Sequence, residues 1–71
     1  MGETKKERFK RLAALRTKEV LERLRILGHC SNKSAYEYTV NDIEKIFSAI
    51  DKQVKIIKSK FQDSIPSEFK L

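Results

Sequence analysis

The sequence predicts an all-α fold, in which two long helices form an antiparallel hairpin around a long connecting loop. Two segments carry apolar residues at helical spacing, and a mostly polar stretch separates them. Seventy-one residues suffice for one small domain. We therefore expect a single domain, 1–71, made of a first helix at about 4–27, a loop at 28–39, a second helix at about 40–63 and a tail at 64–71.

The first segment is predicted to be an amphipathic helix. Five apolar residues recur at intervals near 3.6 residues and share one face: Phe9, Ala13, Val20, Leu24 and Leu27. Gly28 follows the last of them, where a residue in the left-handed conformation often ends a helix. We therefore expect the helix to end before Gly28, with this glycine in the left-handed region.

The second segment has the more regular pattern. Six apolar residues follow one another at intervals of four, three, four, three and four, which is a heptad pattern: Ile43, Phe47, Ile50, Val54, Ile57 and Phe61. A strand would bury Glu44 and Lys52 together with apolar residues, so the spacing favours a helix. Thr39 and Asp42 form a capping-box pattern, which predicts that the helix begins near Val40.

The small size of the apolar faces predicts that the hairpin needs a partner. Antiparallel pairing would set Phe9 opposite Phe61, Ala13 opposite Ile57 and Val20 opposite Ile50, yet half of each apolar face would stay uncovered. Small chains resolve this problem by oligomerising, and the simplest closed form is a two-fold dimer that makes a four-helix bundle. We expect the following residues at the contact between copies: Leu15, Ile26, Ile46, Ile56, Tyr36 and Tyr38.

The two tyrosines of the loop have two interpretations. Tyr36 and Tyr38 would cap the open end of the bundle with their hydroxyls in water. Alternatively, the loop from Ser31 to Tyr38 is a recognition surface, because Ser, Asn and Tyr side chains form adaptable hydrogen bonds and long ordered loops are often functional.

The composition gives little support to catalysis or to cofactor binding. His29 and Cys30 are neighbours in a loop, whereas a Cys–His nucleophile pair normally comes from positions distant in sequence. A zinc site would need at least two further ligands, and two glycines cannot build a Gly-rich phosphate loop. We therefore expect no enzymatic activity, no metal, no cofactor and no small-molecule substrate.

The sequence also predicts no membrane association. No apolar run reaches the length of a membrane span, and residues 1–6 lack the apolar core of a signal peptide. A single cysteine fits a reducing compartment, so a cytoplasmic location is expected.

Positive charge is concentrated in the first helix. Residues 1–28 contain nine Lys or Arg and four Glu, a net charge of +5, whereas residues 29–71 have a net charge of +1. The helix dipole disfavours cations in the opening turns, so helix stability does not explain their presence there. The candidate residues for contact with a phosphate backbone are Lys5, Lys6, Arg8, Lys10, Arg11, Lys18 and Arg25.

These patterns predict a non-enzymatic, homodimeric interaction module with a regulatory or accessory role. Its expected charged partner is a nucleic acid, bound through phosphates with weak sequence specificity. Phe9, the aromatic residue among the basic ones, belongs to the apolar face and is not available to stack on bases. The alternative is a protein-binding adaptor or inhibitor that uses the apolar helix edge and loop 31–38 and has no nucleic-acid role. In that alternative the basic start is a solubilising arm.

Overall fold

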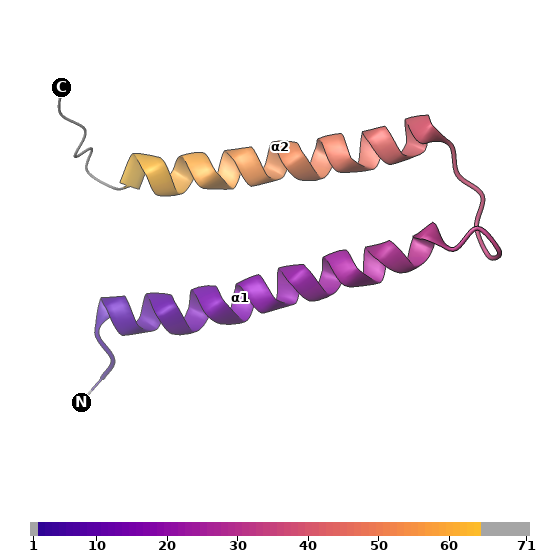
Figure 1. The fold of residues 1–71 in the computed structure, drawn as a ribbon. Coiled ribbons are helices and arrows are strands. Elements are labelled where there is room, and N and C mark those ends of the chain that lie inside the picture. The colour runs from indigo at the N-terminus through magenta and orange to yellow at the C-terminus, as the bar shows by residue number, and fades with distance from the viewer. Residues whose placement is uncertain (1, 65–71) are drawn as a thin grey trace, which may run out of the picture. The chain divides into compact units, whose positions relative to one another are not determined.

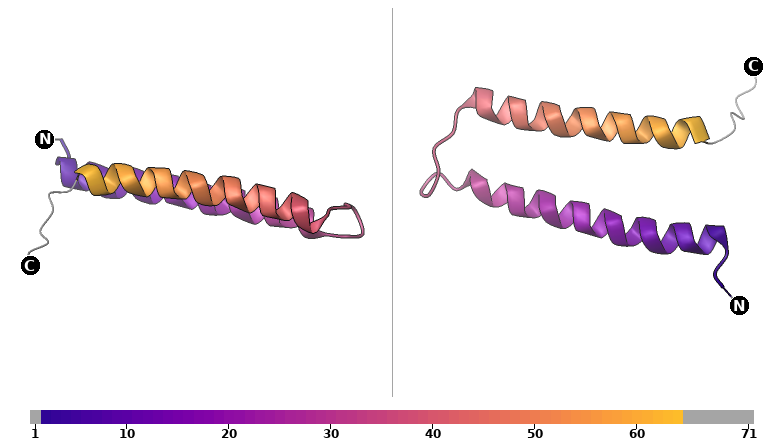
Figure 2. Two further views of the ribbon diagram at one scale, coloured as in Figure 1. Left: turned by 90° about the horizontal axis from the view of Figure 1, so that it is seen from above. Right: turned by 180° about the vertical axis from the view of Figure 1, so that it is seen from behind.

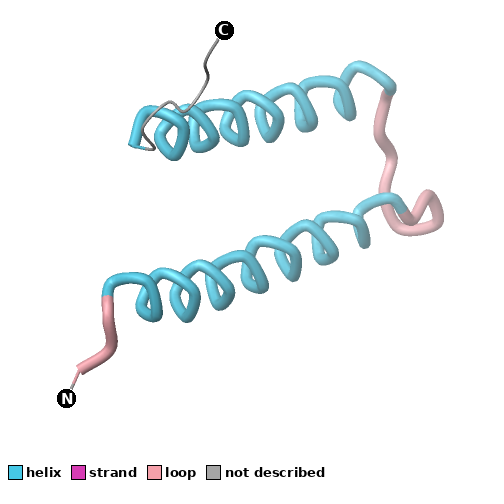
Figure 3. The backbone as a smooth tube through the Cα atoms, turned by 60° about the vertical axis from the view of Figure 1, so that its left-hand side comes forward, coloured by secondary structure: helices cyan, strands magenta, loops and turns pink. Residues whose placement is uncertain are grey.

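The computed structural model describes residues 2–64, and these form two helices and a connection. The elements follow one another as α1 (Lys5–Gly28), the 3₁₀ turn η1 (His29–Ser31) and α2 (Val40–Ser64) (Figure 1). No strand occurs in the described part of the chain, which confirms the all-α prediction (Figure 3). The chain divides into two units, Met1–Glu37 and Tyr38–Leu71. The antiparallel hairpin and its dimer therefore stay predictions. Of the predicted tail, 64–71, only Ser64 lies within the described residues, and it ends α2.

A capping box that the sequence analysis overlooked fixes the start of α1. The Glu7 backbone N–H donates to Thr4 Oγ1 at 3.1 Å, and the Thr4 N–H donates to Glu7 Oε1 at 3.2 Å. Each bond satisfies a backbone donor that lacks a partner within the helix. The Thr-x-x-Glu spacing that produces this cap is present in the sequence, so the cap could have been predicted from it.

The end of α1 differs from the prediction. Gly28 has φ −58° and ψ −24°, so it continues the helix in the right-handed region. His29 is also right-handed, and its N–H donates to the carbonyls of Ile26 and Leu27. The chain then enters η1, whose tighter turn satisfies carbonyls that a left-handed glycine would otherwise satisfy. The predicted left-handed Gly28 is therefore wrong.

Asn32 organises the connection after η1. Its side-chain Oδ1 accepts from the Ser34 N–H at 3.0 Å, and its carbonyl accepts from the N–H groups of Ala35 and Tyr36 at 3.1 and 3.0 Å. This is an Asx turn followed by a backbone turn, and neither uses a glycine. Part of the predicted loop is thus a defined turn.

The predicted capping box of α2 is confirmed. The Asp42 N–H donates to Thr39 Oγ1 at 3.1 Å, and Asp42 Oδ2 accepts from the Thr39 N–H at 2.9 Å. The hydrogen bond from the Thr39 backbone lowers the pKa of the Asp42 carboxyl, and that from the Thr39 side chain adds to this effect. From this cap α2 runs to Ser64 without interruption, as α1 does between its own ends (Figure 2).

No side chain of the described residues is buried. The least exposed apolar side chains are half-buried, and all of them lie on the predicted apolar faces or their flanks: Leu12, Ala13, Leu27, Ile43 and Ile50. The remaining large apolar side chains of both helices are exposed. Apolar surface of this extent on two helices is typical of a chain that associates with a partner.

Replacement of Gly28 by alanine tests the end of α1. Because φ is negative and a Cβ at Gly28 would meet no atom within 4 Å, we expect Gly28→Ala to raise helix stability. The expected gain is about 0.5–1 kcal/mol, the usual penalty of glycine within a helix.

Urea denaturation followed by circular dichroism at one protein concentration measures this effect. Gly2→Ala is the matched control and should change nothing, since Gly2 precedes the helix. A loss of stability in Gly28→Ala would show that this glycine is left-handed in solution.

Candidate nucleic-acid interface

Four cationic side chains occupy the first two turns of α1 without an acidic partner among residues 2–64. These are Lys5, Lys6, Arg8 and Lys10, and all four are exposed. The ion pairs and side-chain hydrogen bonds of residues 2–64 involve none of them. The nearest carboxylates are already engaged, because Glu7 belongs to the cap and Glu3 binds Arg11. The start of α1 is therefore a cluster of uncompensated positive charge at the positive end of the helix dipole.

Arg11 is held by Glu3. The Arg11 Nε lies 3.1 Å from both carboxylate oxygens of Glu3, and Nη2 lies 2.6 Å from Oε1. This bidentate geometry matches the guanidinium fork, and the Glu3 carboxylate raises the pKa of Arg11. Arg11 is one of the residues predicted to bind phosphate, but in the structure Glu3 occupies its guanidinium fork.

Arg25 is engaged in the same way at the other end of the helix. Its Nε donates to Glu22 Oε2 at 3.0 Å, and its Nη1 lies 3.4 Å from His29 Nε2. The ion pair raises the pKa of Arg25 and lowers that of Glu22. Of the predicted stripe of Arg11, Lys18 and Arg25, only Lys18 remains without an ion-pair partner in the described chain. The stripe is therefore a weaker candidate than the start of the helix.

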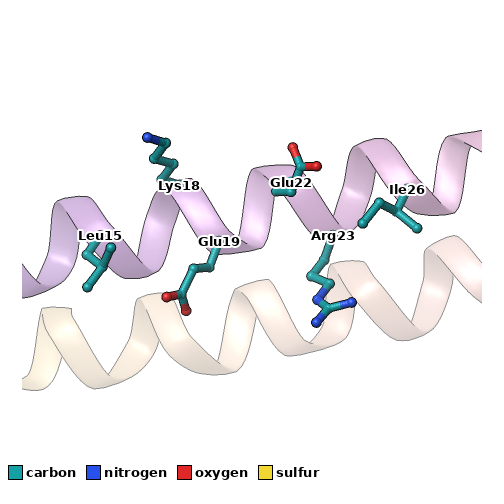
Figure 4. Close-up of a pocket in the computed structure, with 6 residues that line it drawn as sticks. All are labelled: Leu15, Lys18, Glu19, Glu22, Arg23 and Ile26. Atoms are coloured by element: carbon teal, nitrogen blue, oxygen red, sulfur yellow. The ribbon is translucent and has the colours of Figure 1, made fainter.

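The predicted interface residues of α1 lie together on a second face of that helix. Leu15 and Ile26 are 52% and 42% exposed and line one shallow surface depression with Lys18, Glu19, Glu22 and Arg23 (Figure 4). The side chains of Lys18 and Glu22 extend from one edge of this face, and those of Glu19 and Arg23 extend from the other (Figure 4). Two apolar side chains among four charged ones make a poor core for a stable contact.

The predicted interface residues outside α1 are accessible as well. On α2, Ile46 lies beside the apolar face and Ile56 lies away from it, and both side chains are exposed. In the connection, Tyr36 is 53% exposed, whereas Tyr38 is half-buried. The two tyrosines therefore differ in their environments, and Tyr36 is the more exposed of the two.

The residues considered for chemistry form no recognisable centre. Cys30 is a free, exposed thiol, and His29 lies near the guanidinium of Arg25. Within residues 2–64, no group of three or more His, Cys, Asp or Glu side chains is arranged to hold a metal ion. In the same range, no helix has the length and apolarity needed to cross a membrane.

Comparison of the chain with protein-family models, with curated proteins and with solved structures finds no match in any of the three. Its function is therefore inferred from its own residues and their geometry.

Replacement of Glu3 by glutamine tests the ion pair at the start of α1. In Glu3→Gln the fork of Arg11 loses its carboxylate, so we expect the Arg11 Nε proton to exchange faster with water. Nuclear magnetic resonance of the arginine side chains measures this exchange, and Arg25 serves as the internal control because its partner is Glu22. Unchanged exchange at Arg11 would contradict the pairing.

Proposed function

We propose that this chain is a non-enzymatic helical interaction module that binds the phosphate backbone of nucleic acids through the start of α1. In this proposal the chain acts as a homodimer of helical hairpins, arranged as a four-helix bundle, in a regulatory or accessory role in the cytoplasm. The observation that carries it is the cluster of Lys5, Lys6, Arg8 and Lys10, which has no acidic partner among the described residues.

Electrostatics supports a polyanion as the partner of this cluster. Unpaired lysine and arginine side chains near a helix N-terminus raise the local concentration of an anion and release counterions when they bind phosphates. Local acidic residues do not neutralise the cluster, because Glu3 and Glu7 are committed to Arg11 and to the cap. Phosphate contacts of this kind position a protein on a nucleic acid without reading its sequence.

The proposed hairpin would strengthen the same site. An antiparallel arrangement sets the end of α2 beside the start of α1, and the second half of α2 has a net positive charge, since residues 52–63 contain four Lys and one Asp. Like charges gathered at one end are unfavourable for folding alone, and a bound polyanion would relieve their repulsion. The proposed hairpin and the proposed partner therefore support each other.

The exposed apolar surface supports the proposed dimer. Within residues 2–64, both helices keep their large apolar side chains at least partly accessible, and small domains commonly cover such faces by oligomerising. A two-fold pair of hairpins would cover these faces and carry two basic clusters for each assembly.

A second candidate function rests on Tyr36. This side chain is exposed on a connection that is held in a defined turn by hydrogen bonds donated to Asn32. An ordered, exposed tyrosine is a common anchor in protein–protein contacts. In this alternative the chain is a protein-binding adaptor or inhibitor, and the basic start of α1 serves only solubility.

Salt-dependent titration against mixed-sequence DNA and RNA duplexes tests the proposed function. We expect binding that weakens steeply between low and physiological salt. The variant Lys5→Ala, Lys6→Ala, Arg8→Ala, Lys10→Ala should lower the slope of log affinity against log salt by about 1 for each phosphate that the variant no longer neutralises.

The matched control removes four cations elsewhere, in Arg23→Ala, Lys33→Ala, Lys45→Ala, Lys52→Ala. It changes the net charge equally and should keep most of the slope, and circular dichroism checks that both variants stay helical. No binding by the original chain at about 50 mM salt, or an equal loss in both variants, would overturn the proposal and favour the protein-binding alternative.

A further inference from the structure

The apolar face of α2 has a pattern that reads the same in both directions. Its six residues are separated by four, three, four, three and four positions, an order that is unchanged when the helix is reversed. In an antiparallel pair of α2 helices, Ile43 would therefore meet Phe61, Phe47 would meet Ile57, and Ile50 would meet Val54. Every phenylalanine then faces an isoleucine, which lets large and smaller side chains interdigitate.

A parallel pair of the same helices would pack differently. Each residue would face its own copy, so Phe47 would meet Phe47 and Phe61 would meet Phe61 in the narrow core of a two-helix contact. The faces that must be covered are accessible, since Phe47, Val54 and Ile57 are 49%, 44% and 48% exposed. Packing therefore favours the antiparallel orientation.

Charge along α2 favours the same orientation. Residues 40–51 contain one Lys and three acidic residues, a net charge of −2, and residues 52–63 contain four Lys and one Asp, a net charge of +3. An antiparallel pair sets the acidic half of each helix beside the basic half of the other. A parallel pair would set like charges side by side, which costs free energy.

One pair of side chains makes this complementarity specific. Glu44 and Lys58 flank the apolar face on the same edge, and facing edges of antiparallel helices carry residues of the same heptad position. Both side chains are exposed, and neither takes part in an ion pair or side-chain hydrogen bond within residues 2–64. Within one helix they are 14 residues apart, about 21 Å, so they cannot meet in the same helix.

We propose that two copies of this chain associate through an antiparallel contact of their α2 helices, with Glu44 of each copy beside Lys58 of the other. The inference rests on the proposed self-association and adds its orientation and register. In the four-helix bundle the apolar face of α2 would be shared between two neighbours. The edge with Glu44 and Lys58 would lie against α2 of the second copy, and the opposite edge would lie against α1 of its own copy. The register sets Asp51 beside Asp51 of the second copy, near the two-fold axis. This single repulsion opposes two attractive pairs and limits the strength of the dimer.

A charge-swap cycle measured by sedimentation equilibrium tests the contact. Glu44→Lys and Lys58→Glu each turn two attractive pairs into two repulsive ones, so each should raise the dimer dissociation constant about tenfold. The double variant has the net charge of the original chain and should recover most of this loss. Asp51→Asn should tighten the dimer, because it removes the repulsion at the axis.

Cysteine pairs provide a second measurement in a Cys30→Ser background. Phe47→Cys together with Ile57→Cys should form disulfide-linked dimers quickly, whereas Phe47→Cys alone should not. The two positions are ten residues apart, about 15 Å in one helix, so the bond must join two copies. Rapid linkage through Cys at position 47 alone would show a parallel pair and overturn the inference.

The outcomes separate this inference from the proposed function. If the original chain is a dimer but the effects of Glu44→Lys and Lys58→Glu simply add, the antiparallel α2 contact is wrong and self-association stands. If the original chain is a monomer, both the contact and the proposed self-association fail. Nucleic-acid binding is measured independently by the salt titration, so it can stand or fall in either case.

Discussion

The apolar face of α2 is the constraint on which the rest of the account depends. Six large side chains recur at heptad spacing on this helix, and four of them are exposed in the described chain. Each such side chain contributes roughly 1.5–3 kcal/mol when it leaves water completely. A helix with this pattern is stable as part of a larger assembly, because packing of an amphipathic face supplies most helical stability in proteins.

The charged side chains are of two kinds: some stabilise the helices of this chain, and others are available to a partner. Glu7 and Asp42 cap the two helices, and Glu3 and Glu22 each hold an arginine. Other cations gather at the start of α1 and in the second half of α2. The cations at the start of α1 lower helix stability, and in the proposed dimer those of α2 would complement the acidic half of a second α2.

The sequence was sufficient for the features that depend on local patterns. Heptad spacing and the Thr39–Asp42 box predicted α2 to within one residue of its bounds. The prediction was wrong at Gly28, since a glycine after a helix can equally remain right-handed when a 3₁₀ turn follows. The ion pair between Glu3 and Arg11 was not predicted, because these residues are eight positions apart and meet only where the chain enters the helix. Arg11 and Arg25 are paired with Glu3 and Glu22. The strongest candidates for contact with nucleic acid are therefore the four residues at the start of α1: Lys5, Lys6, Arg8 and Lys10.

Sedimentation equilibrium of the unmodified chain tests the central claim most directly. For the proposed dimer we expect a mass near twice the 8.3 kDa of one chain, approached as the protein concentration rises. A dimer of this kind covers the α2 face with a second copy. A mass of 8.3 kDa at every concentration, with the helices intact by circular dichroism, would contradict the account.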